Sequence, residues 1–290
     1  MTYTGGMFTS EQPAGELPTI EVPVFVVMDH DRTRARVDAG VDRLLHLAAR
    51  HGIDEMAVRQ AQASIEADGM SFAPLSFIRE LLARNGRQVE LAQLRDEFVT
   101  NGSKADQLLY PGVSQFEHGL RSAPSVPYMV LTAGVDTEWQ EWKLAASGFD
   151  GYAHIIPVPE GSLTPPKGPV ITSWQSPDNT YSVTAYDVSG RPVALIRAHN
   201  VMLVDDKAVS FQGLPAGSHG AYVVYDDAGL ISQGNASMLP ADCSITTVHD
   251  LSGINMQLLR PDAGTTNIGI LSQAVSYVPL ALDNYTMEAV

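Results

Sequence analysis

The sequence predicts an α/β fold in which a mainly parallel sheet forms the core and a long helical segment is inserted. Three observations support this prediction. Short, continuous apolar runs recur along the chain, which is typical of strands buried on both faces of a parallel sheet. Segments with helical periodicity lie between several of these runs. From Arg34 to about Asn101 the spacing is helical and no convincing strand is found.

The predicted strands are rich in β-branched and aromatic residues. The first, Val22–Met28, ends in an acidic cluster. Polar residues also follow the carboxyl ends of other runs, where open α/β sheets place their ligands. Further strands are expected at Tyr128–Leu131, Ala153–Ile156, Val201–Val204, Ala221–Val224 and, as a weaker candidate, Ile245–Val248.

The inserted segment is expected to contain a series of helices whose apolar stripes form a core of their own rather than a cofactor-binding surface. Glycines that can end helices lie near the ends of these patterns. They are Gly52, Gly69, Gly86 and Gly102. The stripes are Val37, Val41, Leu44, Leu45 and Ala48 in the first helix, Ile65 in the second, Phe77, Ile78, Leu81 and Leu82 in the third, and Val89, Leu91, Leu94 and Phe98 in the fourth.

The remaining segments are assigned from local patterns. Residues Tyr181 to Ile196 alternate apolar and polar around Ser189-Gly190, which predicts a hairpin. Residues 1–20 have no apolar period, so we expect a flexible N-terminal arm. The predicted organisation is an α/β core of residues 21–33 and 110–252, a helical insert of residues 34–109 and a C-terminal extension of unknown role at residues 253–290.

Composition limits the classes of function. The chain has 33 Asp and Glu residues and 18 Lys and Arg residues, so its net charge is −15. This excess of negative charge argues against a nucleic-acid partner. A small phosphorylated ligand is not excluded, because a metal ion can reverse the sign of a local field. Cys243 is the one cysteine, so an internal disulfide and a multi-cysteine zinc site are excluded. We expect a cytoplasmic protein without membrane association, since no signal-peptide pattern and no apolar run of about 20 residues is found. Self-association into a homo-oligomer is left open.

The first candidate for chemistry is Asp29-His30-Asp31-Arg32-Thr33, directly after the first predicted strand. Two carboxylates one residue apart at a strand end can take different duties. One can attack as a nucleophile while the other transfers protons, provided that a cation keeps the first ionised. The alternative interpretation is an acidic turn or a helix cap.

Further candidates also follow predicted strands. A hydroxyl with neighbouring backbone N–H groups, as at Thr132-Ala133, can bind an anion. Asp205 and Asp206 offer the oxygen ligands that Mg²⁺ prefers, although an acidic turn is the alternative. A lysine could offset these charges. Lys167 fits this role and Lys143 competes with it, but its helical position favours a structural role for Lys143.

In this order, the motifs resemble those of the haloacid dehalogenase superfamily of Mg²⁺-dependent phosphohydrolases. In that family an apolar strand ends in DxDGT, a second strand ends in Ser or Thr, a Lys or Arg follows, and an acidic pair ends a later strand. The resemblance covers about Val22–Leu251 and implies a three-layer Rossmann-like core with an α-helical cap inserted after the first motif. The interval between Lys167 and Asp206 is longer than expected, and the predicted hairpin accounts for the excess.

For the first motif, the resemblance implies that Asp29 is the nucleophile that forms an aspartyl-phosphate. It implies that Asp31 is the general acid and base and that its backbone carbonyl helps to ligate Mg²⁺. Arg32 stands where the family usually has glycine, which eases a tight turn. Its side chain either approaches a substrate phosphate or lies in solvent. His30 is expected to face the pocket or the cap and to tune the choice of substrate.

For the later motifs, the resemblance implies that Thr132, with Ala133 beside it, binds the transferring phosphoryl group. Lys167 would hold the charges of the nucleophile and the phosphate together. Asp206 would ligate the metal directly and Asp205 through a bridging water. Cys243 has no visible histidine partner and is interpreted as buried filler.

The predicted function is Mg²⁺-dependent hydrolysis of a small phosphorylated metabolite through an aspartyl-phosphate. Two alternatives stay open. A phosphomutase acting on one sugar would use the same residues. A catalytically silent family member could instead serve as a binding or assembly subunit, which Arg32 and the unexplained tail favour. A dehalogenase is less favoured, because such members usually lack the second acid, here Asp31.

Overall fold

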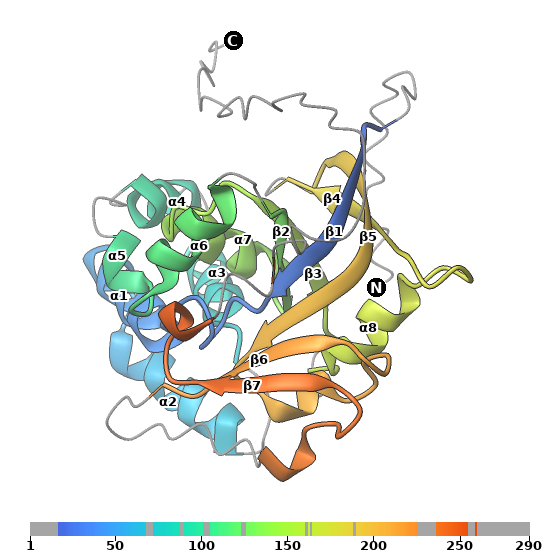
Figure 1. Cartoon of the computed structure of the whole chain (residues 1–290). Coiled ribbons are helices and arrows are strands. Elements are labelled where there is room, and N and C mark those ends of the chain that lie inside the picture. Colours follow the sequence, from blue (N-terminus) through green and yellow to red (C-terminus); the bar gives the residue numbers. More distant parts are fainter. Residues whose placement is uncertain are drawn as a thin grey trace. The chain divides into compact units, whose positions relative to one another are not determined.

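The fold is described from a computed structural model, which describes residues 17–67, 72–87, 90–100, 105–122, 126–159, 162, 164–187, 190–225, 236–254 and 259. Its centre is a sheet of seven strands in the order β3-β2-β1-β5-β6-β7, with β4 paired to β5 (Figure 1). Every pairing is parallel except that of β4 with β5. The strands are β1 Thr19–Met28, β2 Tyr128–Gly134, β3 Tyr152–Pro157, β4 Tyr181–Tyr186, β5 Pro192–Asp205, β6 His219–Val223 and β7 Ser244–Val248.

Helices cover both faces of this sheet, which confirms the predicted three-layer α/β core. Strand β1 shows why: Val26 and Met28 lie in one apolar cluster with Val113 of α6, whereas Phe25 and Val27 lie in another with Ile171 of α8. The helices are α1 Val37–Arg50, α2 Glu55–Ala67, α3 Pro74–Arg84, α4 Glu90–Thr100, α5 Ala105–Leu108, α6 Val113–Arg121, α7 Thr137–Ala146 and α8 Lys167–Ser173, with 3₁₀ turns at Ala208–Phe211, Ala236–Met238 and Leu251–Gly253.

The hairpin predicted around Ser189-Gly190 is present as β4 and β5, with Tyr181 opposite Ala198. The prediction was wrong in separating this hairpin from the Val201–Val204 strand, because β5 runs without a break from Pro192 to Asp205. The joining residues are polar at alternate positions, so their polar side chains face outward while the ladder to β1 continues through them.

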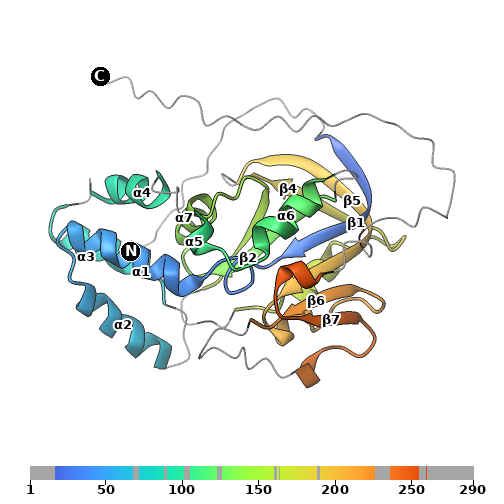
Figure 2. The ribbon, with the colours of Figure 1, turned by 60° about the vertical axis from the view of Figure 1, so that its left-hand side comes forward.

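The helices of the inserted segment match the predicted apolar stripes in position. Helices α1 to α4 lie together in Figure 2, and they share a buried cluster with α7, in which Phe98 packs against Trp139 and Trp142. Gly52 and Gly86 adopt positive φ just after α1 and α3, as expected for residues that end helices. Gly69, Val89 and Gly102 lie outside the described residues.

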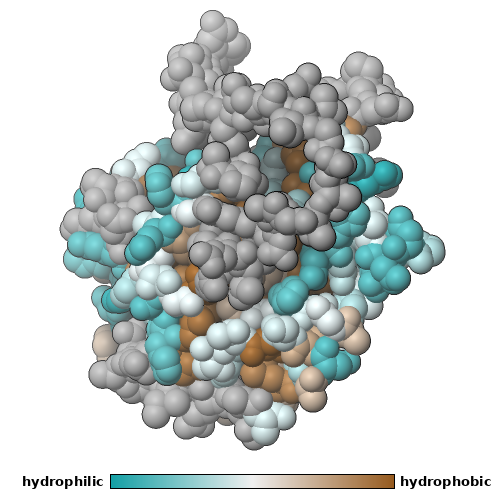
Figure 3. Space-filling model, in the orientation of Figure 1, coloured by the Kyte–Doolittle hydropathy of each residue, from teal (hydrophilic) through white to brown (hydrophobic). Residues whose placement is uncertain are grey.

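The ends of the chain bear on three predictions. β1 begins at Thr19, within the range expected to be a flexible arm, and residues 1–16 lie outside the described residues. Residues 255–258 and 260–290, most of the predicted C-terminal extension, also lie outside them. None of the described helices is long and apolar enough to cross a membrane. On the face shown in Figure 3, hydrophobic residues form local patches among hydrophilic ones.

Candidate active site

Asp29 and Asp31 lie in the turn that follows β1. The Asp29 N–H donates to the carbonyl of Val204 at 2.9 Å, which extends the pairing of β1 with β5 beyond the strand. The turn then closes on itself, since the N–H groups of Arg34 and Ala35 donate to the carbonyl of His30. The Asp29 side chain, at the end of a central strand, is therefore directed to the edge where β2 and β5 also end.

Arg32 adopts the left-handed conformation, with φ of 64°, in this turn. The site therefore keeps a backbone that suits glycine, at a cost of roughly 1–2 kcal/mol for a residue with a Cβ. Its N–H donates to the carbonyl of Ala35 at 2.8 Å and its side chain is exposed. The substitution of arginine for the family's usual glycine does not open the turn.

Lys167 joins two of the predicted acidic residues. Its Nζ lies 2.5 Å from Oδ1 of Asp29 and 2.6 Å from Oδ2 of Asp205, and all three side chains are buried. Lys167 is the first residue of α8, so the sheet and a helix place the ammonium between β1 and β5. Burial alone would lower the pKa of Lys167, but the two carboxylates outweigh it and raise that pKa.

Thr33 connects the first motif to the acidic pair, and the sequence interpretation gave its side chain no role. Its hydroxyl lies 3.4 Å from Oδ2 of Asp29 and 3.3 Å from Oδ1 of Asp206, and it accepts the Asp206 N–H at 3.0 Å. A hydroxyl has one hydrogen to donate, so it serves one of these carboxylates at a time. The place of Thr33 in the DxDxT pattern was the signal that could have assigned it.

Asp31 has a lysine of its own, which the sequence interpretation had favoured as structural. Lys143 Nζ lies 2.5 Å from each oxygen of the Asp31 carboxylate, and Gln140 Nε2 lies 3.4 Å from Oδ2. Burial on its own would raise the pKa of Asp31, but Lys143 outweighs it and holds the pKa at about 2. Gln140 and Lys143 are three residues apart on α7, a spacing that places them on one helix face.

Thr132 and Ala133 end strand β2, as predicted. The buried Thr132 hydroxyl donates to Oε1 of Gln140 at 3.3 Å, and the carbonyl of Ala133 accepts from Nε2 at 3.5 Å. Gln140 therefore links the predicted phosphate-binding residues to Asp31. The Thr132 hydroxyl donates its hydrogen to this amide, so it must rotate before it can donate to a ligand in the site.

His30 is fully buried, and within the described part of the chain neither ring nitrogen has a hydrogen-bond partner. It lines a small cavity with Arg36, Phe98 and Lys143, so it lies against the helical segment. Burial lowers the pKa of its imidazole well below the usual value. Of the two positions expected for His30, the structure gives the one beneath the cap.

The residues present fit a hard divalent cation. Oxygens of Asp29, Asp205 and Asp206 all lie within 4.8 Å of one another, and the three side chains are buried. Burial first, and then the neighbouring carboxylates, raise the pKa of Asp29 to about 6 and that of Asp206 to about 7. Oxygen ligands at this density are what Mg²⁺ binds. The Asp31 carboxylate is outside this group because it is held by Lys143.

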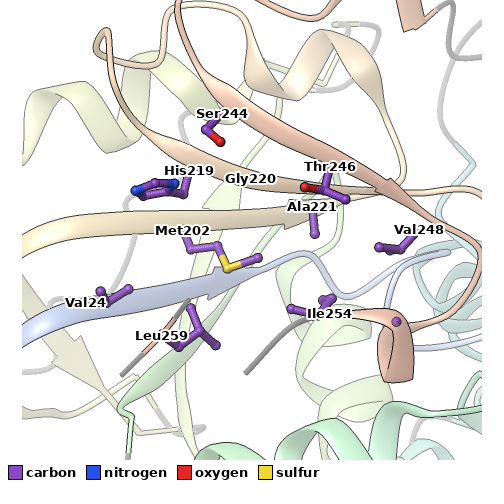
Figure 4. Close-up of a pocket in the computed structure, with 11 residues that line it drawn as sticks. Val24, Met202, His219, Gly220, Ala221, Ser244, Thr246, Val248, Ile254 and Leu259 are labelled. Carbon is purple, nitrogen blue, oxygen red and sulfur yellow. The ribbon is translucent and has the colours of Figure 1, made fainter. Parts of the chain in front are cut away.

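A separate pocket lies against β5, β6 and β7 (Figure 4). It is lined by Val24, Met202, His219, Gly220, Ala221, Ser244, Thr246, Val248, Gly253, Ile254 and Leu259. None of these is an acid or a lysine, so the pocket offers none of the charged side chains of the site described above.

Comparison with known proteins finds likeness in fold. No protein-family model and no curated protein matches the chain. Several similar solved structures are haloacid dehalogenase-like hydrolases, the family that the motifs resemble. A protein of Burkholderia xenovorans LB400 assigned to these hydrolases is 18% identical, with a TM-score of 0.49 over 83% of this chain and 97% of its own. The magnesium-bound YfnB of Bacillus subtilis, assigned likewise, is 12% identical, with a TM-score of 0.43 over 83% and 100%. A Thermotoga maritima protein assigned as a β-phosphoglucomutase is 12% identical, with a TM-score of 0.42 over 79% and 96%.

Proposed function

We propose that this protein is a Mg²⁺-dependent phosphatase that hydrolyses a small phosphorylated metabolite through an aspartyl-phosphate. The observation that supports it most is the buried contact of Lys167 with both Asp29 and Asp205, with Asp31 two residues after Asp29 at the same strand end. The acidic net charge of −15 favours a small ligand over a nucleic acid.

In the first step, an oxygen of Asp29 forms a bond to the phosphorus of the substrate. The bond from phosphorus to the leaving oxygen breaks, and that oxygen takes a proton from the carboxyl group of Asp31. In the second step, Asp31 takes a proton from water as the water oxygen attacks the phosphorus. Asp29 leaves as a carboxylate, inorganic phosphate is released, and Asp31 is protonated again.

The charges around the two acids must change when ligands bind. A nucleophile has to be ionised, whereas the pKa of Asp29 is raised to about 6, and a general acid has to carry a proton, whereas Lys143 holds that of Asp31 at about 2. A cation beside Asp29 lowers its pKa, and a phosphate dianion beside Asp31 raises that of Asp31. Binding of metal and substrate therefore moves both groups toward the states that catalysis needs.

The other residues bind and orient the phosphoryl group. Lys167 offsets the charge of Asp29 as the phosphate approaches, and the Thr132 hydroxyl, which donates to Gln140 in this structure, turns to donate to a phosphoryl oxygen. Asp29 and Asp206 would hold Mg²⁺, together with the carbonyl of Asp31 and, through water, Asp205. When bound, the ion supplies positive charge that stabilises the oxygens of the transferring phosphoryl group.

The direct test is release of p-nitrophenol from p-nitrophenyl phosphate by the purified protein, with Mg²⁺ and with a chelator in its place. We expect release that depends on Mg²⁺ and is restored when the metal is added back. A panel of phosphorylated metabolites then identifies the substrate, with free phosphate as the readout for hydrolysis and isomerised product for a mutase. Absence of either product across the panel would contradict the proposal and favour a silent binding subunit.

A further inference from the structure

One face of α7 is directed at Asp31 and at Thr132. Gln140 and Lys143 lie on this face, and both are buried although both are polar. Buried polar groups are costly unless they are paired, so a helix that carries two of them normally uses both. Here both are paired with residues of the proposed mechanism, since Lys143 binds Asp31 and Gln140 contacts Asp31 and Thr132.

The exposure of the two partners shows from which side the lysine approaches. The Asp31 side chain is 25% exposed, whereas that of Lys143 is 6% exposed. The ammonium therefore lies on the interior side of the carboxylate, and the part of Asp31 that stays accessible opens toward solvent. Because Nζ lies 2.5 Å from both oxygens, the lysine orients the carboxylate while part of the Asp31 side chain stays exposed.

Helix α7 is itself fixed on both sides. Asp136 caps its first turn by accepting the Trp139 N–H at 3.1 Å and also accepts the hydroxyl of Ser76 from α3 at 2.5 Å. Trp139 and Trp142 of α7 lie in the apolar cluster of the helical segment, and Lys143 Nζ lies 5.5 Å from the centroid of the Trp139 ring. Because the helix is held by these contacts, the position of Lys143 Nζ is set by packing and not by Asp31 alone.

Lys167 does not duplicate this role. It contacts Asp29 and Asp205, and among the described residues the ammonium that contacts the Asp31 carboxylate is that of Lys143. We propose that Lys143 is a positioning residue that aims the Asp31 carboxyl at the leaving oxygen, and that Gln140 ties this carboxyl to the phosphate-binding Thr132. This inference rests on the proposed phosphatase function and adds to it a residue outside the four motifs.

A positioning role predicts a dependence on the leaving group that a structural role does not. The phenolate of phenyl phosphate is a poor leaving group that needs a proton, whereas the p-nitrophenolate of p-nitrophenyl phosphate leaves more readily without one. General acid catalysis typically contributes 10²–10⁴-fold. We therefore expect Lys143→Met to lower kcat/KM for phenyl phosphate by about 10²-fold, with a clearly smaller loss of kcat/KM for p-nitrophenyl phosphate. This ratio reports the first step, in which the two leaving groups differ, whereas the second step is the same for both substrates.

The comparison with Asp31→Asn tests whether Lys143 acts through Asp31. If it does, the double variant Asp31→Asn/Lys143→Met loses no more activity than Asp31→Asn alone, because coupled residues are not additive. Lys143→Arg should recover part of the loss, since it keeps the charge. Gln140→Leu should show the same leaving-group dependence more weakly. If Lys143→Met does not fold, Lys143→Arg and Gln140→Leu are measured in its place.

Arg84→Met serves as the control, because Arg84 is an exposed cation on α3 that contacts Glu80. Its activity should equal that of the wild type, and thermal unfolding checks that every variant is folded. An equal loss of kcat/KM for both substrates, or losses that add in the double variant, would overturn the positioning role while leaving the phosphatase intact. A wild-type protein that releases no phosphate with Mg²⁺ from these substrates or from the metabolite panel would overturn the proposed function and this inference with it.

Discussion

Asp29 and Asp31 show how two identical side chains two positions apart are given different surroundings. Asp29 follows the last residue of a central strand and is buried with Lys167 and a second carboxylate. Asp31 lies two residues further along the turn, where its side chain is partly exposed and contacts Lys143. A group beside other carboxylates is a site for a cation, and a group with an exposed edge can exchange protons with a substrate. Their roles are thus separated by the turn itself.

Replacing the proposed nucleophile is the sharpest test at this scale. In Asp29→Asn the amide cannot form the aspartyl-phosphate, so turnover of p-nitrophenyl phosphate should fall by at least about 10³-fold. Lys167 still contacts Asp205, so the fold should be kept, which circular dichroism checks. Asp42→Asn, an exposed carboxylate on α1, is the matched control and should keep full activity. Near-normal turnover in Asp29→Asn would rule out this nucleophile.

Arg32 offers a test of backbone strain that is independent of activity. Its φ of 64° favours glycine over any residue with a Cβ. Although glycine normally costs stability through its freedom in the unfolded chain, Arg32→Gly should unfold at a free energy about 1 kcal/mol higher than Arg32→Ala. Urea denaturation measures the difference. If the alanine variant were the more stable of the two, the turn would not be strained at this position.

At the scale of elements, α7 links the inserted helical segment to the site. The helix packs Trp139 and Trp142 against Phe98 of α4, with ring centroids 5.3 and 6.1 Å apart, and presents Gln140 and Lys143 to Asp31. We therefore expect a change in how the helical segment packs to be transmitted to Asp31, the carboxyl group that the proposed mechanism uses for proton transfer. The connection is helix α7 itself, which contacts the helical segment through its tryptophans and Asp31 through Gln140 and Lys143.

Phe98→Ala tests this connection. The ring is fully buried, and its removal leaves a cavity between α4 and α7, so we expect a loss of about 3–5 kcal/mol in the free energy of unfolding. Met56→Ala on α2, where the side chain is 62% exposed, should change stability by less than about 0.5 kcal/mol. Denaturant unfolding of both variants gives the comparison. Equal effects would mean that the cluster does not hold the segment to α7.

The sequence could predict the elements better than the contacts between them. Buried strands such as β2 are marked by continuous apolar runs, and the place of Asp29 and Thr132 follows from the rule that ligands lie at strand ends. The role of Lys143 could not be read in this way, because periodicity defines the faces of a helix but not which face meets the sheet. The continuity of β5 was missed for a related reason. The alternation that ends at Ile196 and the apolar run Val201–Val204 are different patterns, and only the partner strand shows that one ladder continues through both.

At the scale of the whole molecule, an acidic chain concentrates negative charge at one buried point. Asp29, Asp205 and Asp206 lie together with one lysine in direct contact among the described residues, so the charge there is not balanced by the protein alone. Burial and mutual repulsion favour protonation of these groups in the folded state. A divalent cation would relieve both, which makes stability itself a readout of metal binding.

This gives a prediction for pH and Mg²⁺ together. The pKa values of Asp29 and Asp206 are raised from 3.8 to about 6 and about 7, so between about pH 4 and 7 the folded state binds more protons than the unfolded state. Stability contributed by these groups is therefore lost as pH rises through that window, at about 1.4 kcal/mol for each unit of raised pKa. The midpoint of thermal unfolding should be lower at about pH 7.5 than at about pH 5, and Mg²⁺ should raise it at the higher pH far more than at the lower.

In Asp206→Asn the fall with pH should be smaller and the response to Mg²⁺ should be largely lost, while Asp42→Asn behaves as the wild type. A wild-type midpoint at about pH 7.5 that is unchanged by millimolar Mg²⁺ would show that the three carboxylates do not bind the ion.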